Sequence, residues 1–389
     1  MTSAKPFTMA SDNESGFELD NLTITHPITA RRVKRGESLR GCYKILLLGT
    51  TGSGKSTFIE TLCPSSKPTL AISGNTLESV TQSLQEYFID GITPSPTSSN
   101  PAQRIVLIDT PGMADDKISE NAVVNGVVGW LYERTHFINH IIYFDRITDV
   151  RMGGNRKRAI ELFKLLSGVQ AAGNVTIATT MWDQLGVSDA GDGVESSRGE
   201  ERRKKGETAM NKALERFEEL RRGYWESFTT SNTNPNPKSP TSPSPSNPTP
   251  ITKFINTQPS ALHILNTAVS RYSIDTNFEV EKPAKTAGNG VVRMPFGRVL
   301  YEGLRERLER LKMRGRGVEE EIEGMSGGGV VQGEGGVMGD LDLNTEDRDE
   351  LLQLLMKEKE DVEFMKGRVE YELSGFGPVL PPEWGIENN

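Results

Sequence analysis

Short apolar runs alternate with amphipathic stretches over the first two thirds of the chain. Apolar runs of strand length predict buried strands at residues 45–48, 104–108, 140–144, 175–180 and 251–255. Apolar residues at helical spacing predict helices at residues 57–62, 119–132, 155–166, 210–224 and 260–270. Strands that alternate with helices predict an α/β fold with a doubly wound, mostly parallel sheet. Ligands of such sheets bind at the carboxyl ends of the strands.

Polar and low-complexity stretches divide the rest of the chain. Residues 1–41 are polar and aperiodic, which predicts a mostly disordered arm, and a Pro/Ser-rich stretch at 231–250 predicts an insertion in a domain spanning 42–272. Polar composition also predicts a loop at 90–103 and a mobile stretch at 184–205. Residues 273–389 form a linker and a helical extension, with helices at 296–313 and 344–375 around a Gly-rich linker at 314–343. The apolar stripes of these helices pack on the parent domain or form a coiled coil.

Composition narrows the class of protein. The 389 residues are 35% hydrophobic and 25% charged, and the net charge of −8 disfavours bulk binding to nucleic acid or anionic lipid. Two cysteines and four histidines form no spaced metal cluster, which suits a reducing, cytoplasmic location. No apolar segment approaches the length needed to span a membrane, and the N-terminal sequence lacks a signal peptide.

The motif G-x-x-x-x-G-K-S directly follows the first buried strand. Glycines let such a loop curl so that its backbone N–H groups point at phosphate oxygens, and the helix that follows aims its positive end at the same anion. The Lys55 side chain would reach the β- and γ-phosphates, and the Ser56 hydroxyl would ligate Mg²⁺. The motif therefore predicts a three-layer P-loop NTPase fold. The predicted phosphate-binding residues are Gly49, Thr51, Gly52, Ser53, Gly54, Lys55, Ser56 and Thr57.

Asp109-Thr-Pro-Gly112 ends a second hydrophobic strand, about 54 residues after Lys55. P-loop enzymes place the acid of the magnesium site at this position, so Asp109 is predicted to hold Mg²⁺. The Gly112 N–H is predicted to meet a γ-phosphate, so that the loop after it senses hydrolysis. Asp-Thr-Pro-Gly alone also suits an ordinary turn, and its position after the strand makes the functional interpretation the stronger one.

Thr180-Met-Trp-Asp183 ends another strand, where GTPases carry a base-recognition motif. A carboxylate at Asp183 can accept two hydrogen bonds from guanine, a pair that adenine cannot donate. The alternative is that Asp183 only caps the following segment.

These motifs together resemble the translation-factor class of P-loop GTPases, in particular the branch of immunity-associated GTPases, chloroplast-import receptors and septins. Two further stretches, residues 143–154 and 179–183, are similar to largely uncharacterised G-domain proteins common in fungi. The resemblance covers residues 42–272 and implies guanine-nucleotide (GTP/GDP) and Mg²⁺ binding.

The resemblance also implies roles for single residues. Thr81 matches a switch threonine that ligates Mg²⁺, beside Ser56 and Asp109, and Thr180 belongs with Asp183 to the base motif. Either Ser260-Ala261 or Asn256-Thr257 completes the base pocket. Catalysis would rest on Lys55, Ser56 and Thr81.

Two departures from the family pattern bear on activity. Met181 stands where the family has a lysine that packs on the base, and Met113 stands where many relatives have a water-orienting glutamine. Slow GTP hydrolysis is therefore expected, raised by homodimerisation across the nucleotide face. Arg146 and Arg151 could act as trans-acting arginines, although salt bridges or helix-packing roles are favoured.

Three functions remain open at this level. The first is a GTPase switch whose effector protein is unknown. The second is a module that holds nucleotide in order to assemble with itself, with little or no hydrolysis. An ATPase or small-molecule kinase is disfavoured by the Asp-Thr-Pro-Gly turn and by the lack of a recognisable lid.

Overall fold

The computed structural model describes most of the chain as two compact units. Unit 1 comprises residues 1–110, 137–152 and 167–278, and unit 2 comprises residues 111–136, 153–166 and 279–389. The described residues are 19–66, 70, 83–95, 103–134, 137–150, 152–185, 197–225, 228, 249–271, 277–283, 290–326 and 345–386.

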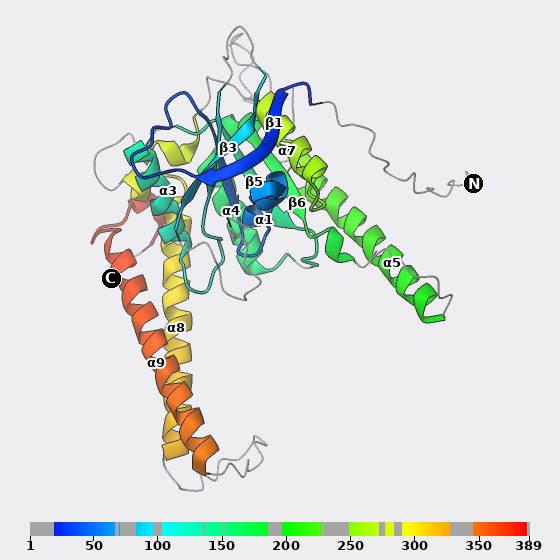
Figure 1. Ribbon diagram of the computed structural model, residues 1–389. Helices are drawn as coiled ribbons and strands as arrows, with labels where there is room; N and C mark the ends of the chain where they lie inside the picture. The colour runs from blue at the N-terminus through cyan, green and yellow to red at the C-terminus, as the bar shows by residue number, and fades with distance from the viewer. Residues whose placement is uncertain are drawn as a thin grey trace, which may run out of the picture. The chain divides into compact units, whose positions relative to one another are not determined.

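A seven-stranded mixed sheet forms the centre of unit 1 (Figure 1). Its strand order is β1-β3-β4-β2-β5-β6-β7, with β1–β3 and β3–β4 antiparallel and the remaining pairs parallel. The strands are β1 (Leu22–Arg32), β2 (Tyr43–Gly49), β3 (Gln85–Pro94), β4 (Ile105–Asp109), β5 (His140–Arg146), β6 (Val175–Thr180) and β7 (Ile251–Lys253). The carboxyl ends of β2, β4, β5 and β6 therefore share one edge, which is where the predicted motifs lie.

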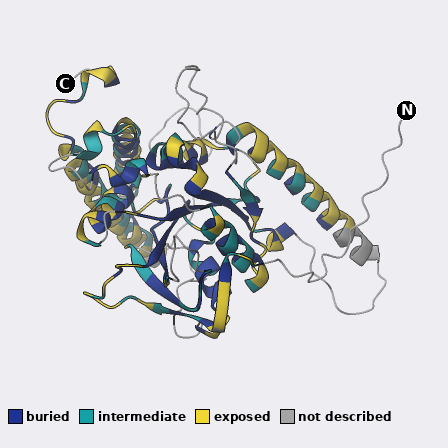
Figure 2. Cartoon of the chain, turned by 90° about the horizontal axis from the view of Figure 1, so that it is seen from above, coloured by how far each residue is buried: buried dark blue, intermediate teal, exposed yellow. Residues whose placement is uncertain are grey.

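Helices of unit 1 cover both faces of this sheet. Helices α1 (Lys55–Leu62) and α7 (Gln258–Ser270) share a core with one face, where Phe58 packs edge-on against Phe144 at 5.3 Å between ring centroids. Helix α5 (Ser197–Glu219) continues as a π-helical turn (Leu220–Trp225), and Trp225 packs at 5.6 Å from Tyr143 on the opposite face. Figure 2 shows the resulting dark-blue buried strands. The predicted α/β P-loop fold with a mostly parallel sheet is confirmed.

The described residues of unit 2 include four α-helices, the last two of which form an antiparallel pair (Figure 1). The helices are α3 (Glu120–Arg134), α4 (Gly154–Ser167), α8 (Gly297–Ser326) and α9 (Thr345–Ser374). Helices α8 and α9 are joined by ion pairs at Arg314–Glu358 (2.7 Å) and Lys359–Glu319 (2.8 Å). On both helices a buried residue recurs every seven positions: Leu304, Leu311 and Val318 on α8, and Leu355, Val362 and Val369 on α9. The predicted C-terminal helical extension is confirmed.

Short 3-10 turns complete the two units. They are Pro64–Ser66, Val169–Asn174, Asp183–Leu185, Glu279–Glu281, Gly290–Arg293 and Pro382–Trp384.

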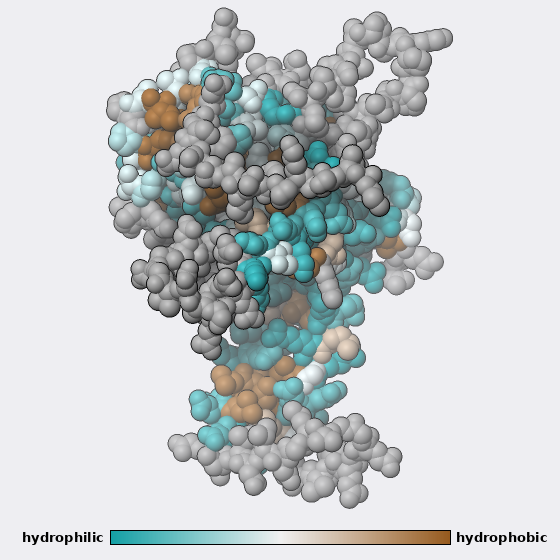
Figure 3. Space-filling model, turned by 90° about the vertical axis from the view of Figure 1, so that its right-hand side faces the viewer, coloured by the Kyte–Doolittle hydropathy of each residue, from teal (hydrophilic) through white to brown (hydrophobic). Residues whose placement is uncertain are grey.

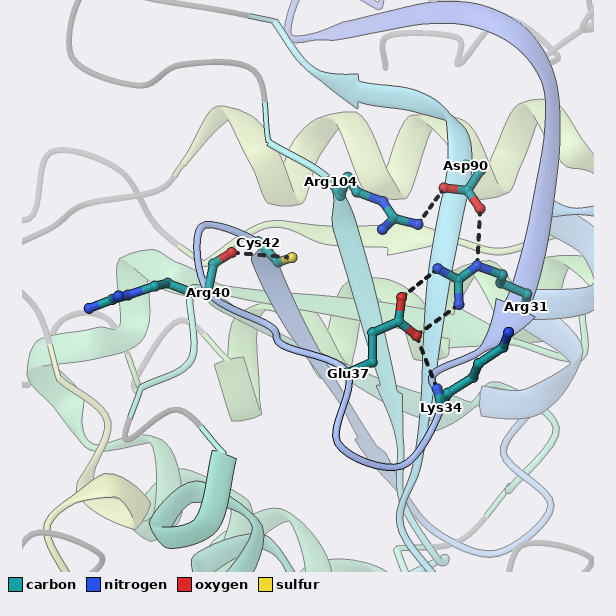
Figure 4. A network of polar contacts seen from close by, with 7 residues as sticks. All are labelled: Arg31, Lys34, Glu37, Arg40, Cys42, Asp90 and Arg104. Atoms are coloured by element: carbon teal, nitrogen blue, oxygen red, sulfur yellow. Dashed lines mark hydrogen bonds and ion pairs between the residues drawn. The ribbon is translucent and has the colours of Figure 1, made fainter.

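The prediction of a disordered arm over residues 1–41 is wrong for residues 22–32, which form edge strand β1. An ionic network joins β1 to its neighbours (Figure 4). A pattern of hydrophobic residues along the sequence does not predict such ion pairs. The Arg31 guanidinium donates two hydrogen bonds to the Glu37 carboxylate, at 2.7 and 3.0 Å. Those bonds and a further donor, the Lys34 N–H, lower the pKa of Glu37 to about 2. Asp90 of β3 joins the network through Arg31 (3.7 Å) and Arg104 (2.8 Å).

Three other polar stretches are also more regular than predicted. Strand β3 continues to Pro94, through part of the predicted 90–103 loop, because Ile92 is buried and pairs with Ile24. Helix α5 begins at Ser197, within the stretch predicted to be mobile. Helix α8 continues to Ser326, beyond the predicted linker boundary, because Val318 is buried and Glu319 pairs with Lys359. The low-complexity stretch at 231–248 and the linker at 327–344 lie outside the described residues.

Candidate functional site

The predicted phosphate loop joins the end of β2 to the start of α1. Three of its glycines have positive φ, at 152° for Gly49, 72° for Gly52 and 90° for Gly54. Space is tightest at Gly49, where a Cβ would lie 2.5 Å from the Phe144 carbonyl oxygen and 2.7 Å from Ser53 Oγ. A larger residue at 49 would therefore displace β5 or the loop itself.

The Lys55 side chain folds back across this loop. Its Nζ donates hydrogen bonds to the carbonyl oxygens of Gly49 (3.3 Å) and Thr50 (3.1 Å), and the residue is 6% exposed. Ser53 Oγ is buried in the same loop and has no hydrogen-bond partner among the described residues. A buried cation beside an unpartnered hydroxyl suits the binding of an anion such as a phosphate.

Ser56 and Asp109 form the second part of the site. Asp109 ends β4 beside Leu47 of β2, which brings its carboxylate to the first turn of α1. Ser56 Oγ donates a hydrogen bond to Asp109 Oδ2 at 2.7 Å, and Asp109 is fully buried. A hydroxyl and a carboxylate are oxygen ligands of the kind that Mg²⁺ prefers, so this pair fits the predicted metal.

The base motif lies at the end of β6, two strands from β2. A Cβ on Gly54 would lie 3.7 Å from Thr180 Cγ2, so the threonine side chain lies beside the phosphate loop. Asp183 opens the next 3-10 turn and is exposed. The chain turns sharply between them, with Met181 at a φ of 64°, which is uncommon for a residue that is not glycine.

Trp182 fixes the shape of this turn. Its indole N–H donates to the carbonyl (3.1 Å) and hydroxyl (3.0 Å) oxygens of Thr179. The ring stacks edge-on with Phe217 of α5 at 5.8 Å, and the Lys253 ammonium lies 4.8 Å from its centroid. Sequence reasoning did not identify Phe217 or Lys253, because nothing in their local sequence marks them as neighbours of β6.

The two predicted completions of the base pocket have different surroundings. Ser260 and Ala261 lie within the first turn of α7, where Ser260 Oγ donates to the Thr257 carbonyl at 2.7 Å in a capping box and Ala261 is buried. Asn256 precedes this helix with a φ of 58°, in the loop that follows β7, and its Oδ1 accepts a hydrogen bond from Thr61 at 2.9 Å. The loop candidate is therefore the one at the carboxyl edge of the sheet.

Arg146, considered above as a trans-acting arginine, ends β5 beside the loop. Its Nη2 pairs with the Asp149 carboxylate at 3.1 Å, and its Nη1 lies 3.6 Å from where a Cβ on Gly52 would be. The salt bridge that sequence reasoning favoured is present. Arg151 and the predicted switch threonine, Thr81, lie outside the described residues.

Gly112 belongs to unit 2, where the segment after it is held by α8 and α9. The buried Arg307 guanidinium of α8 donates to the carbonyl oxygens of Asp115 (2.7 Å), Asp116 and Ile118 (3.4 Å). Glu372 of α9 accepts hydrogen bonds from the side chains of Ser119 and Asn121 at the start of α3. Sequence reasoning missed both residues, since each lies more than 180 positions from the segment that it holds.

Among the described residues, no helix is long and apolar enough to cross a bilayer. The described part of the chain likewise holds no group of three or more His, Cys, Asp or Glu side chains that could bind a metal ion. The candidate Mg²⁺ site is of a different kind, with one hydroxyl and one carboxylate.

Comparisons with known proteins agree with the motif assignment. Residues 44–162 match the family model described as a 50S ribosome-binding GTPase. No curated protein matches the chain. The strand order and the phosphate loop agree with this GTPase family model over residues 44–162.

Solved structures that are similar to this chain include Toc33 from Arabidopsis thaliana. Its complex with GDP and Mg²⁺ is 13% identical and matches 61% of this chain and 87% of that chain, with a TM-score of 0.35. Its complex with Mg²⁺ and GMPPNP is 13% identical, matching 60% and 87%, with a TM-score of 0.33. A third structure concerns dimerisation and the GTPase activity of the chloroplast translocon components atToc33 and psToc159, at 12% identity, 61% and 85% coverage and a TM-score of 0.35. Because these scores are low, the fold assignment rests on the strand order and the loop.

Proposed function

We propose that the chain binds GTP and GDP with Mg²⁺ and hydrolyses GTP slowly, as a conformational switch. The observation that supports this proposal is that Thr180 of the base motif lies near Gly54 of the phosphate loop. One nucleotide can then be held at both ends, by its phosphates and by its base.

The phosphate end uses the loop and its flanking residues. Backbone N–H groups from Gly49 to Thr57 and the Lys55 ammonium would bind the β- and γ-phosphates and offset the charge that develops during transfer. Ser56 and Asp109 would hold Mg²⁺, which supplies positive charge to the same oxygens when it is bound. Thr81 would add a third ligand.

The base end uses the turn after β6. The exposed Asp183 carboxylate would accept two hydrogen bonds from guanine. Trp182, braced by Lys253 and Phe217, keeps this turn in place. We favour Asn256-Thr257 to complete the pocket, because Asn256 lies in the loop after β7, at the carboxyl edge of the sheet.

Slow hydrolysis follows from the residue at position 113. Met113 is 1% exposed and has no group that can orient a water molecule. The nucleotide-dependent change would involve Gly112 and the segment after it, which Arg307 and Glu372 connect to α8 and α9 within unit 2. This arrangement favours the helical pair as the output of the switch towards an effector protein.

A second candidate function is nucleotide-dependent assembly with little hydrolysis. The observation that favours it is the antiparallel α8–α9 pair. Its buried residues recur every seven positions, which is the heptad repeat of a coiled coil. A homodimer across the nucleotide face belongs to the same proposal. The buried free thiols of Cys42 and Cys63 agree with a cytoplasmic location.

A nucleotide titration of the full chain tests the main proposal. With Mg²⁺ present, GTP and GDP should bind at least tenfold more tightly than ATP, and GTP should release phosphate at a low rate. Binding without any phosphate release would favour the assembly function. Equal affinity for ATP and GTP would contradict the base assignment.

A further inference from the structure

Helix α9 exposes a second seam on the side away from its buried residues. Leu355, Val362 and Val369 form the buried side. The seam, spaced alternately by four and three residues, keeps to one face of the helix, and all of its members are exposed. Its members are Glu350, Leu354, Lys357, Asp361, Phe364, Arg368 and Tyr371.

Three large apolar side chains of this seam are exposed. Leu354 is 59% exposed, Phe364 66% and Tyr371 80%. Hollows lie on both sides of Phe364 and Arg368, one lined also by Arg314 of α8 and one by Asn125 of α3. Figure 3 shows hydrophobic surface among the hydrophilic residues of the helical pair. Exposed apolar side chains beside hollows and charged residues suit a contact surface.

The order of charges along the seam is complementary to the same order read backwards. About the midpoint at Lys359, Glu350 mirrors Arg368, Lys357 mirrors Asp361, and Leu354 mirrors Phe364. Two copies of α9 laid antiparallel about a twofold axis would thus place opposite charges, or two apolar side chains, across from each other at every one of these positions. This is the self-complementarity that a twofold interface requires.

Four charged residues of the seam have no bonded partner among the described residues. No hydrogen bond or ion pair joins Glu350, Lys357, Asp361 or Arg368 to another described residue, whereas Arg314, Glu319, Glu358 and Lys359 pair across the α8–α9 contact. The seam charges are therefore available to a partner.

We infer that the α9 seam is a homodimer interface in which a second copy of this chain packs antiparallel. The dimer uses neither the phosphate loop nor the base motif, so it differs from the proposed dimer across the nucleotide face and exists with or without nucleotide. It would fix two GTPase domains on one four-helix assembly.

Charge reversal within one chain provides the first test. Sedimentation equilibrium of the full chain should show dimers that weaken at least tenfold in Arg368→Glu and recover in the double variant Glu350→Arg/Arg368→Glu, because each swapped pair again has opposite signs. Arg305→Glu, an exposed charge change on α8, is the matched control and should leave the dimer unchanged. A monomeric wild type, or a dimer insensitive to Arg368→Glu, would overturn the inference.

Disulfide trapping tests the antiparallel register. Residues 350 and 368 are about 27 Å apart along one helix, at 1.5 Å per residue, so they cannot pair within a chain. Glu350→Cys/Arg368→Cys should form a crosslinked dimer under mild oxidation, and each single variant should not. Crosslinking by the single variants would indicate a parallel pair and contradict the proposal. The native thiols should contribute little background crosslinking. Burial raises the pKa of the Cys63 thiol to about 12, and burial also raises the pKa of Cys42.

The Lys55→Ala variant separates this inference from the proposed function. It should lose nucleotide binding and keep the seam dimer. A dimer that disappears with Lys55→Ala would belong to the nucleotide face and would contradict the inference, while leaving the nucleotide proposal standing. A heteromeric complex with an acidic helix in place of the self-dimer would equally contradict it.

Discussion

Thr180 Cγ2 lies 3.7 Å from the position that a Cβ on Gly54 would occupy. Thr180 ends β6 and Gly54 immediately precedes α1, so the proposed base end and phosphate end of the site lie near each other across β5. Their closeness follows from the parallel order β2-β5-β6, since carboxyl ends of parallel strands meet at one edge.

Substitution at Gly49 should damage both folding and binding. A Cβ in Gly49→Ala would meet the Phe144 carbonyl oxygen at 2.5 Å, on a backbone with a φ of 152°. We expect a loss of roughly 2–3 kcal/mol in the free energy of unfolding, within the range for overpacked sites. Urea denaturation measures it, with Gly129→Ala in α3, where a Cβ meets nothing within 4 Å, as the control. A stability equal to that of the control would contradict the described loop geometry.

The Ser56–Asp109 pair should determine the Mg²⁺ dependence of binding. In Ser56→Ala and Asp109→Asn, one proposed oxygen ligand is lost or neutralised, so GTP affinity in Mg²⁺ should fall at least tenfold. Affinity in EDTA should change less. Ser56→Thr retains the hydroxyl and should bind like wild type. Calorimetry with and without Mg²⁺ makes the comparison, and equal losses under both conditions would argue against a metal site here.

The Arg307 contacts should keep the segment after Gly112 ordered within unit 2. Arg307→Lys cannot donate to three carbonyl oxygens in the same geometry, which should cost about 1–3 kcal/mol because buried acceptors lose their partners. Hydrogen exchange over residues 113–122 should accelerate in this variant. Arg310→Lys, an exposed change one turn away, serves as the control. Unchanged exchange in Arg307→Lys would show that the segment is held by other contacts.

Acid should destabilise the fold through His140. Burial in β5 lowers the pKa of this imidazole to about 3, while its unfolded value is about 6.5. The unfolded chain therefore takes up a proton that the folded chain does not, and stability falls as the pH drops from about 6.5 towards 3. The expected loss from this group at pH 5 is about 2 kcal/mol.

Thermal melting across pH 4–8 measures this effect. His140→Gln retains a hydrogen-bonding side chain towards Thr176 and should flatten the pH dependence in this window. An unchanged slope in the variant would assign the acid sensitivity to other groups.

The sequence predicts the parallel part of the sheet well, because strands such as β2 and β5 are buried along nearly their whole length and read as continuous apolar runs. It fails at β1, which pairs with β3 and buries Leu22, Ile28 and Ala30 in the core, because the partners of this strand lie far along the chain. The sequence also predicts an end of helix α8 that is too early, at residue 313. The last turns of this helix contact α9, for example through the Lys359–Glu319 ion pair.

The residues of the candidate site likewise fall into those that the sequence predicts and those that only the structure identifies. The phosphate loop and Asp109 carry local motifs and lie together as predicted, although their ligand roles remain predictions. Arg307, Glu372 and Lys253 lie far along the chain from the segments that they contact, so only the tertiary structure identifies them.

The central claim is that Asp183 reads guanine in the same pocket that holds the phosphates. The most direct test is nucleotide specificity in Asp183→Asn, which turns one acceptor into a donor. We predict that this variant loses GTP affinity at least tenfold and gains affinity for xanthosine triphosphate, which carries an acceptor in place of the guanine amino group. Unchanged GTP affinity, with no gain for xanthosine triphosphate, would contradict the account.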